Sequence, residues 1–287
     1  MVYEFPELQG LMGRYYALAA GMDADIAVAC ETHYSPLGPS DDVPKSAVSI
    51  VVSLADKLDM LTGFWAINER PTGSKDPFAL RRAALGIIRV ILENKLALPL
   101  APFLKKADAG AGASNLMEFF HDRLKGYLRA EGIRYDVIDA CVGMPGDDDL
   151  GLLVKRAKAL QLTLNTDDGE NLIQGFKRAN NILNQAEEKD GVEYSYGADL
   201  KFAESDFEKT LFFALDKVDA LIKSAIDDQN FFNAMTAIAT LRTPIDNFFD
   251  KVQINADNDL IRRNRLNLLS RIRSTCLSVA DLTKLEG

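Results

Sequence analysis

Apolar residues recur along this chain at the spacing of an α-helix, and no stretch shows the sustained apolar and polar alternation of a half-buried strand. Between Ser53 and Ala66, apolar side chains fall on one helical face: Leu54, Leu58, Leu61 and Trp65. After the break at Pro71, a second face of the same kind follows: Leu80, Ala84, Ile87 and Ile91. The pattern predicts an all-α fold from end to end.

The second of these helices carries an unusual pair of cations near its start. Asp76-Pro77 indicates where the helix begins, because Asp can cap free backbone N–H groups and Pro fits the first helical position. Arg81 and Arg82 follow early in the helix, where the positive end of the helix dipole makes cations slightly unfavourable. This position suggests a partner carboxylate or phosphate. The alternative is a pair of solvated or locally paired arginines.

The charge balance limits how the chain could bind a nucleic acid. Its net charge of -9 argues against binding by bulk attraction, since such binding relies on a basic domain that neutralises phosphates. Lys and Arg do cluster in segments 155–158, 177–178 and 262–273, so any contact has to be local. No apolar stretch approaches the roughly 20 residues of a membrane-spanning helix, and the N-terminus lacks the features of a signal peptide. We therefore expect a cytoplasmic protein with no membrane partner.

The cysteines and the pair His121-Asp122 show no motif for metal binding or catalysis. Cys30, Cys141 and Cys276 are far apart and lie among apolar or small residues, which is typical of reduced, buried thiols. His121-Asp122 resembles the signature dipeptide of HD-type metal-dependent phosphohydrolases, but the further His and Asp ligands of that site are missing around it. We interpret the dipeptide as an exposed helical coincidence.

A second HD-like feature lies nearer the N-terminus, where His33 precedes the predicted helix that carries Asp56 and Asp59. The HD motif is absent there as well, so the two aspartates are interpreted as helix-surface residues or partners of nearby bases. Serine and cysteine nucleophiles lack a plausible histidine base, and no glycine-rich phosphate loop follows a strand. We expect no catalytic residue and no metal site.

Longer strings point to a family. The segments are EFPELQGLMGRYYA (4–17), SLADKLDMLTGFWAI (53–67), PTGSKDPFALRRAALGIIRVI (71–91), FFHDRLKGYLRAEGIRYDVIDA (119–140), FKRANNIL (176–183) and FFDKVQINADNDLIRRNRLNLLSRI (248–272). In this order they resemble the C-terminal portion of the beta subunit of bacterial glycyl-tRNA synthetase. The resemblance covers essentially the whole chain.

This resemblance implies a supporting role in the charging of glycine tRNA. In that family a separate alpha subunit holds the active site and uses ATP and Mg, and the beta subunit supplies tRNA recognition. The implied partners are glycine tRNA and the alpha subunit of an alpha2-beta2 enzyme, and no cofactor is expected on this chain. The resemblance also implies that Met1 lies inside a longer subunit. We expect three domains: a truncated HD-like helical domain at 1–72, a helical body at 73–165 and a DALR-type anticodon-binding domain at 166–287.

Candidate RNA contacts follow from helical geometry in the last domain. If Leu172, Ala179, Leu183 and Ala186 face the core, then Lys177, Arg178 and Asn181 face away from it and are open to RNA. Counting 100° per residue places Arg263 and Arg271 away from the apolar stripe of their helix, so we expect them as phosphate contacts. An ordinary solvated helix face is the alternative for each of these residues.

Arg265 differs from its neighbours because it shares the apolar face of the same helix with Leu269, Ile272 and Cys276. A buried guanidinium has to be paired to offset its desolvation, so we expect a structural ion pair, with Asp250 as the partner or Asp246 as the alternative.

Two other functions remain open for the whole chain. They are a helical protein-interaction scaffold without RNA binding and, more weakly, an HD-type phosphohydrolase.

Overall fold

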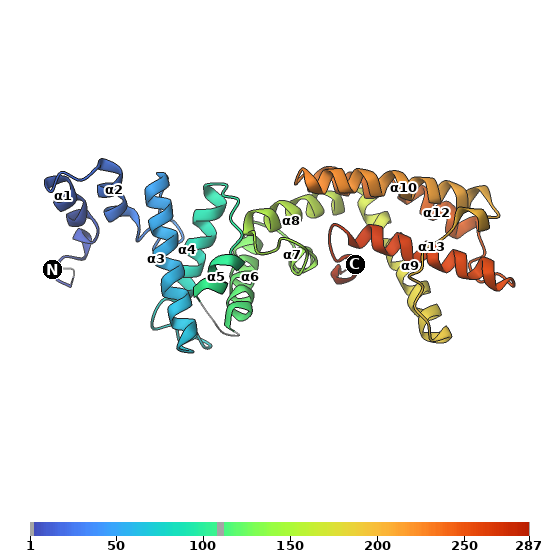
Figure 1. Cartoon of the computed structure of the whole chain (residues 1–287), viewed down its shortest axis with the longest axis horizontal. Coiled ribbons are helices and arrows are strands. Elements are labelled where there is room, and N and C mark those ends of the chain that lie inside the picture. Colours follow the sequence, from blue (N-terminus) through green and yellow to red (C-terminus); the bar gives the residue numbers. More distant parts are fainter. Residues whose placement is uncertain (1–2, 108–111, 287) are drawn as a thin grey trace. The chain divides into compact units, whose positions relative to one another are not determined.

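The computed structural model describes residues 3–107 and 112–286, and within these ranges it contains helices and no β-strand (Figure 1). The predicted all-α fold is confirmed. Two isolated β-bridges, Thr72 with Lys75 and Pro99 with Asp149, are the extended pairings found in these ranges. No described helix combines the length and the apolar character needed to cross a membrane.

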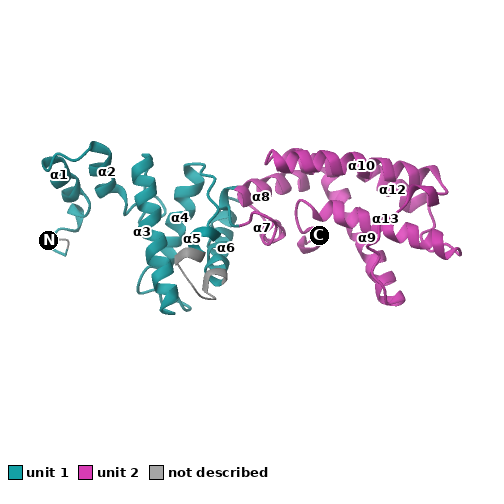
Figure 2. Ribbon diagram, in the orientation of Figure 1, with its two compact units in different colours: residues 1–132, 148–151 teal, residues 133–147, 152–287 magenta. Residues whose placement is uncertain are grey.

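Contacts between Cα atoms divide the chain into two compact units (Figure 2). Unit 1 comprises Met1–Gly132 and Asp148–Gly151, and unit 2 comprises Ile133–Asp147 and Leu152–Gly287. The three domains expected from the sequence rest on a family resemblance, whereas these two units rest on contacts within the fold. The unit boundaries therefore do not test the domain boundaries, which stay a prediction.

Unit 1 is built around α3 and α4. Its elements are η1 (Pro6–Leu8), α1 (Leu11–Ala19), α2 (Ala24–Thr32), α3 (Ala47–Ala66), α4 (Leu80–Glu93), α5 (Ala101–Ala107) and α6 (Gly112–Ala130). Leu54, Leu61 and Trp65 of α3 are buried as the periodicity predicts, whereas Leu58 is half-buried. The Trp65 ring packs 4.8 Å from the Phe119 ring of α6. On α4 the predicted stripe is fully buried: Leu80, Ala84, Ile87 and Ile91.

The start of α4 differs from the sequence prediction. The helix begins at Leu80, and its cap residue Ala79 has a left-handed backbone conformation, with φ of 56°. Asp76 still caps the helix, because its carboxylate accepts the backbone N–H groups of Leu80 at 2.8 Å and Arg81 at 3.0 Å. The capping residue was therefore identified correctly, and the helix starts four residues after it.

The first two helices of unit 1 bury little. In α1 only Ala17 is buried, and in α2 only Ala27 and Ala29. Large apolar side chains of the same helices are exposed instead, among them Tyr15, Tyr16, Leu18 and Ile26. Because small alanine side chains remove little apolar surface from water, these helices gain less from packing than α4 does.

Unit 2 is a helical array in which α9 packs against α12 and α13 and α10 packs against α11, α12 and α13. Its elements are α7 (Tyr135–Cys141), α8 (Leu150–Leu164), which begins in unit 1, α9 (Asp167–Asp190), η2 (Leu200–Phe202), α10 (Asp206–Asp227), α11 (Phe231–Ala239), α12 (Arg242–Lys251), α13 (Asp259–Leu277) and η3 (Leu282–Lys284). The predicted core face of α9 is buried: Leu172, Ala179, Leu183 and Ala186. Cys141 and Cys276 are buried thiols as expected, whereas Cys30 is half-buried.

A close approach at Gly169 shapes the junction between α8 and α9. The Thr166 hydroxyl caps α9 by accepting the backbone N–H of Gly169 at 3.1 Å. A Cβ at Gly169 would lie 2.0 Å from the carbonyl oxygen of Thr163. Glycine is therefore required where the first turn of α9 meets the last turn of α8, and it permits a connection of only two residues, Asn165 and Thr166.

Candidate nucleic-acid interface

The three candidate residues on α9 differ in how freely they could reach a ligand. Arg178 and Asn181 are exposed, and the Arg178 guanidinium lies 4.5 Å from the centre of the Phe249 ring. Lys177 is half-buried and donates a 2.8 Å hydrogen bond to the carbonyl oxygen of Leu285. Arg178 and Asn181 thus lie on the solvent face of α9, whereas Lys177 ties the end of the chain to this helix.

The two candidates on α13 are unlike each other. Arg263 is exposed, and its guanidinium lies 5.8 Å from the centre of the Tyr196 ring, a side chain that is 84% exposed. Arg271 instead forms ion pairs with Asp216 at 2.5 Å and Asp219 at 2.8 Å, both on α10. The expectation that Arg271 is free for phosphate is wrong in this structure, because two carboxylates already neutralise it.

Most of the basic run from 262 to 273 is neutralised in the same way. Arg262 pairs with Asp190 at 2.7 Å, and Arg273 pairs with Glu187 at 3.1 Å. Hydrogen bonds from Tyr194 and Arg262 hold the pKa of Asp190 below its usual range. These arginines join α13 to the end of α9, so Arg263 is the member of the run that presents an unpaired guanidinium among the described residues.

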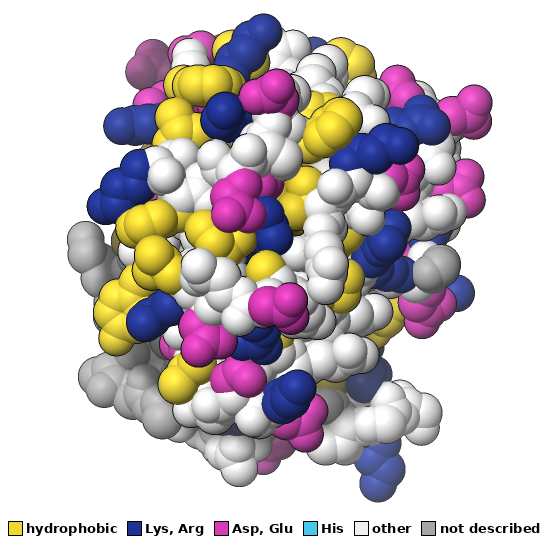
Figure 3. All heavy atoms as spheres, turned by 90° about the vertical axis from the view of Figure 1, so that its right-hand side faces the viewer, with side chains coloured by type: hydrophobic (Ala, Val, Ile, Leu, Met, Phe, Trp, Pro, Cys, Tyr) yellow, Lys and Arg dark blue, Asp and Glu magenta, His cyan; other side chains and the backbone are white. Residues whose placement is uncertain are grey.

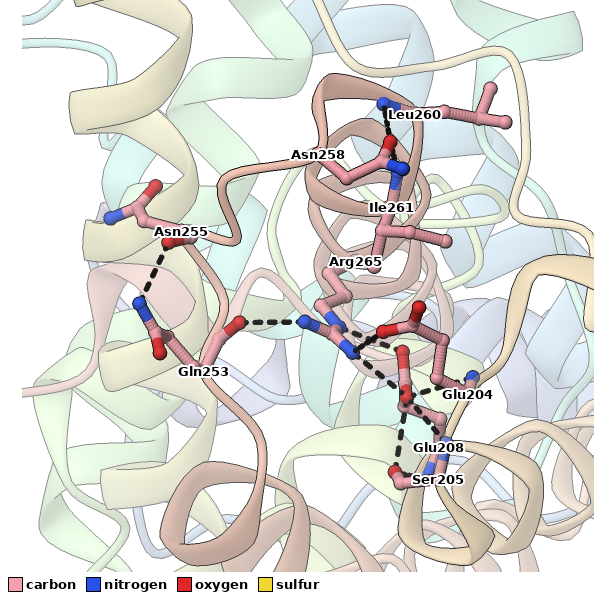
Figure 4. Close-up of polar contacts among 9 residues, drawn as sticks. All are labelled: Glu204, Ser205, Glu208, Gln253, Asn255, Asn258, Leu260, Ile261 and Arg265. Atoms are coloured by element: carbon pink, nitrogen blue, oxygen red, sulfur yellow. Dashed lines mark hydrogen bonds and ion pairs between the residues drawn. The ribbon is translucent and has the colours of Figure 1, made fainter.

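Arg265 is buried, as its place on the apolar stripe predicts, but its partner is not Asp250 (Figure 4). Its Nε donates to Glu208 at 2.8 Å, Nη2 lies 3.1 Å from Glu204, and Nη1 donates to the carbonyl oxygen of Gln253 at 2.9 Å. Asp250 and Asp246 are exposed on α12. The predicted partner was wrong because it came from the segment nearest in sequence, whereas the pair forms with the start of α10.

Glu208 has two roles at that position. Its carboxylate accepts the backbone N–H of Ser205 at 2.9 Å, while the Ser205 hydroxyl accepts the backbone N–H of Glu208, which together form the capping box of α10. Burial alone would raise the pKa of Glu208, but the hydrogen bonds from Arg265 and Ser205 hold it below its ordinary value. The same carboxylate therefore caps α10 and forms an ion pair with Arg265 of α13.

Charges of both signs are interspersed on the surface. On the face drawn in Figure 3, Lys and Arg side chains lie between Asp and Glu side chains and do not form one basic block. The solvent face of α9 follows this pattern, since Glu170 and Glu188 are exposed on the same helix as Arg178. Binding through this surface has to rely on a few directed contacts.

The HD-like features do not form a metal site. Among the described residues, no group of three His, Cys, Asp or Glu side chains is arranged to hold a metal ion. His121 is 8% exposed, so the interpretation of an exposed dipeptide was wrong for the histidine, although Asp122 is exposed. Asp56 and Asp59 lie exposed on α3.

Lys57, between these two aspartates in sequence, is buried and structural. Its ammonium group donates to the carbonyl oxygens of His33 at 2.8 Å and Ser35 at 3.0 Å and to the Ser53 hydroxyl at 2.8 Å. Burial lowers its pKa to about 8, partly offset by the nearby Asp56. Lys57 thus fastens the segment after α2 to α3.

Comparison with known proteins agrees with this geometry. Residues 172–286, which run from the first turns of α9 through α13, match the model of the DALR anticodon binding domain, so this helical array belongs to that class of domain. Residues 1–143 match the model of the glycyl-tRNA synthetase beta subunit. The chain belongs to the family of glycyl-tRNA synthetase beta subunits.

Individual relatives agree along the whole chain. The glycine–tRNA ligase beta subunits of Ruegeria sp. and Paracoccus denitrificans are 64% and 62% identical to it over 287 residues. That of Dinoroseobacter shibae is 59% identical over 322 aligned positions. Each alignment covers 100% of this chain but only 42% to 45% of the relative, so the chain spans less than half the length of these proteins.

Proposed function

We propose that this chain is the tRNA-recognition portion of the beta subunit of glycine-tRNA ligase, and that it supports ATP-dependent charging of glycine tRNA by the alpha subunit in the cytoplasm. The observation that carries the proposal is the match of α9–α13 to an anticodon-binding domain behind a segment that matches the beta subunit. On this proposal the chain carries no catalytic residue and no cofactor. ATP and Mg act on the alpha subunit of an alpha2-beta2 enzyme.

Arg263 and Tyr196 are the best-placed RNA contacts. An exposed aromatic ring gives a base a surface to stack on, and a guanidinium beside it can hold the adjoining phosphate. Tyr196 lies in the break between α9 and α10, and Arg263 reaches it from α13. Arg178 and Asn181 add a cation and an amide on α9, of which Asn181 is suited to a base edge. Lys177 and Arg271 are less available because each is already engaged.

The test is a titration of the full chain with glycine tRNA at two salt concentrations. Tyr196→Ala should weaken binding by about 5-fold to 150-fold, the loss of one stacked base at roughly 1 to 3 kcal/mol. Arg263→Ala should weaken it as well and reduce the slope of log affinity against log salt by about 1. Asn181→Ala should mainly reduce discrimination against a tRNA with an altered anticodon.

Arg271→Ala is the matched control, because it removes the same side chain from the same helix at a position held by two aspartates. It should leave tRNA affinity within about twofold of the unchanged chain, since a phosphate would have to displace those carboxylates. Equal effects of Arg263→Ala and Arg271→Ala would contradict the proposed contact surface. Absence of salt-dependent tRNA binding would favour a helical protein-interaction scaffold.

A further inference from the structure

A pocket of about 770 Å³ lies in unit 1, and its lining residues belong to that unit and not to the helices that match the anticodon-binding domain. It is lined by the turn at residues 36–39, by Asp76, Ala79 and the part of α4 from Arg81 to Arg89, and by the part of α6 from Asp122 to Tyr127. Its volume is in the range of pockets that hold small organic ligands, roughly 300 to 1,000 Å³. No residue that could contact RNA in the proposed function lines it.

The pocket is rich in guanidinium groups. Four arginines line it against two carboxylates: Arg81, Arg82, Arg89 and Arg123, with Asp76 and Asp122. The Asp76 carboxylate is occupied by the backbone N–H groups that it caps at the start of α4. The lining therefore carries an excess of positive charge that its own carboxylates do not neutralise.

Two of the four arginines are fixed to the protein. Arg89 donates to the carbonyl oxygens of Gly38 at 2.8 Å and Asp41 at 2.6 Å, and it pairs with Glu93. Arg81 donates to the carbonyl oxygen of Gly73 at 2.6 Å. The Arg89 bonds hold the 36–39 turn against α4, and the Arg81 bond holds the loop before α4 to the same helix, so this wall of the pocket is formed without a ligand.

The other two arginines have no anionic partner among the described residues. Arg82 is exposed and makes no ion pair there, and the buried Nε of Arg123 has no hydrogen-bond partner. Arg123 lies 5.5 Å from the Phe119 ring, which does not satisfy that N–H group. Guanidinium groups pair well with phosphate oxygens, because their N–H donors match the phosphate geometry. The two groups thus supply donors for an incoming anion.

The remaining walls favour an anion with an apolar or planar body. Apolar side chains and one aromatic side chain line the same pocket: Pro36, Leu37, Pro39, Ala79, Leu85 and Tyr127. The Asp122 carboxylate adds a hydrogen-bond acceptor for a hydroxyl or amino group. A ligand that combines a phosphate group with a planar ring and with hydroxyl and amino groups is a nucleotide.

We propose that this pocket of unit 1 binds a nucleoside monophosphate, with the phosphate on Arg82 and Arg123 and the base and sugar on the proline and leucine wall. The site is separate from the proposed anticodon contacts, so it does not depend on them. Its nucleotide is either free in solution or one residue of an RNA strand.

Calorimetric titration of the full chain with AMP, GMP, CMP and UMP, in turn, tests the site. At least one nucleotide should bind at least tenfold more tightly than inorganic phosphate or the matching nucleoside alone, because each of these fills only part of the pocket. Arg82→Ala and Arg123→Ala should each weaken that binding roughly tenfold or more, the loss of a charge-assisted contact. Arg129→Ala, an exposed arginine of α6 outside the pocket, is the matched control and should change nothing.

If Arg123→Ala disturbs folding, the Arg82→Ala variant alone tests the site, since Arg82 is exposed and unpaired among the described residues. Failure of all four nucleotides to bind, or equal binding by the Arg82 and Arg129 variants, would overturn the proposal. Displacement of a bound fluorescent nucleotide by glycine tRNA would identify the source as an RNA strand, and no displacement would identify a free nucleotide. A Tyr196→Ala variant that loses tRNA binding should still bind the nucleotide, so the two proposals are tested separately.

Discussion

Arg265→Ala should lower the free energy of unfolding by about 3 to 5 kcal/mol, because it leaves the Glu208 carboxylate, whose side chain is 1% exposed, buried without its charge partner. In a unit of this size the loss corresponds to a fall of roughly 6 to 20 °C in the melting midpoint. Thermal unfolding of the full chain followed by circular dichroism measures it.

Arg271→Ala provides the comparison for this prediction. It breaks two ion pairs on the same helix, but their carboxylates are 63% and 42% exposed, so water can replace the arginine. We expect a loss of at most about 1 kcal/mol. If the two variants were equally stable, the Arg265–Glu208 pair would not be isolated from solvent. Its burial would then not determine how much it contributes to the free energy of unfolding.

Gly169→Ala should destabilise unit 2 by about 3 kcal/mol, the upper end of the usual range for an overpacked position. The added methyl group, whose position is set by the backbone, would overlap the Thr163 carbonyl, which is itself backbone, so no flexible side chain can move aside. The two helices would have to separate where only two residues connect them. Chemical denaturation in urea would show this as a lower midpoint.

Gly63→Ala is the matched control, since Gly63 is in the interior of α3 and a Cβ there would meet nothing within 4 Å. This change should raise stability by about 0.5 to 1 kcal/mol, because alanine favours the helix and loses less backbone entropy on folding. A stabilising effect at both glycines would show that α8 and α9 do not approach each other as closely as described.

Helical periodicity predicted the buried stripes of α4 and α9 and the burial of Arg265, but it did not predict the burial of His121 or the partners of buried charges. The stripe on α13 correctly placed Arg265 inside, because burial follows from the 3.6-residue repeat. Its partner depends on which helix packs against that face, and this is a property of the tertiary fold. The S-x-x-E spacing of Ser205 and Glu208 is typical of a capping box, although it was not among the predictions, and nothing local connects it with a residue 57 positions away.

The candidate contacts show the same limit. Arg271 faces away from the stripe as the geometry requires, yet Asp216 and Asp219 of α10 reach it there. Tyr196 was missed because an aromatic residue in a loop has no periodicity to indicate its exposure. Its position between two acidic or polar stretches near a basic helix gave at most a weak signal. For His121, the two phenylalanines before it, Phe119 and Phe120, were the available indication of burial, whereas the charged Asp122 follows it.

The three alanines that α1 and α2 bury have a consequence for how the chain opens. A helix with so little apolar surface removed from water separates from its neighbours at a small fraction of the global unfolding free energy. Backbone amide hydrogens of α1 and α2 should therefore exchange with solvent deuterium well before those of α4, whose stripe is fully enclosed. Equal protection of the three helices in a mass-spectrometric exchange experiment would contradict this order. A protease added under native conditions should make its first cuts at the same helices, and should leave the chain from α3 onward as a resistant product.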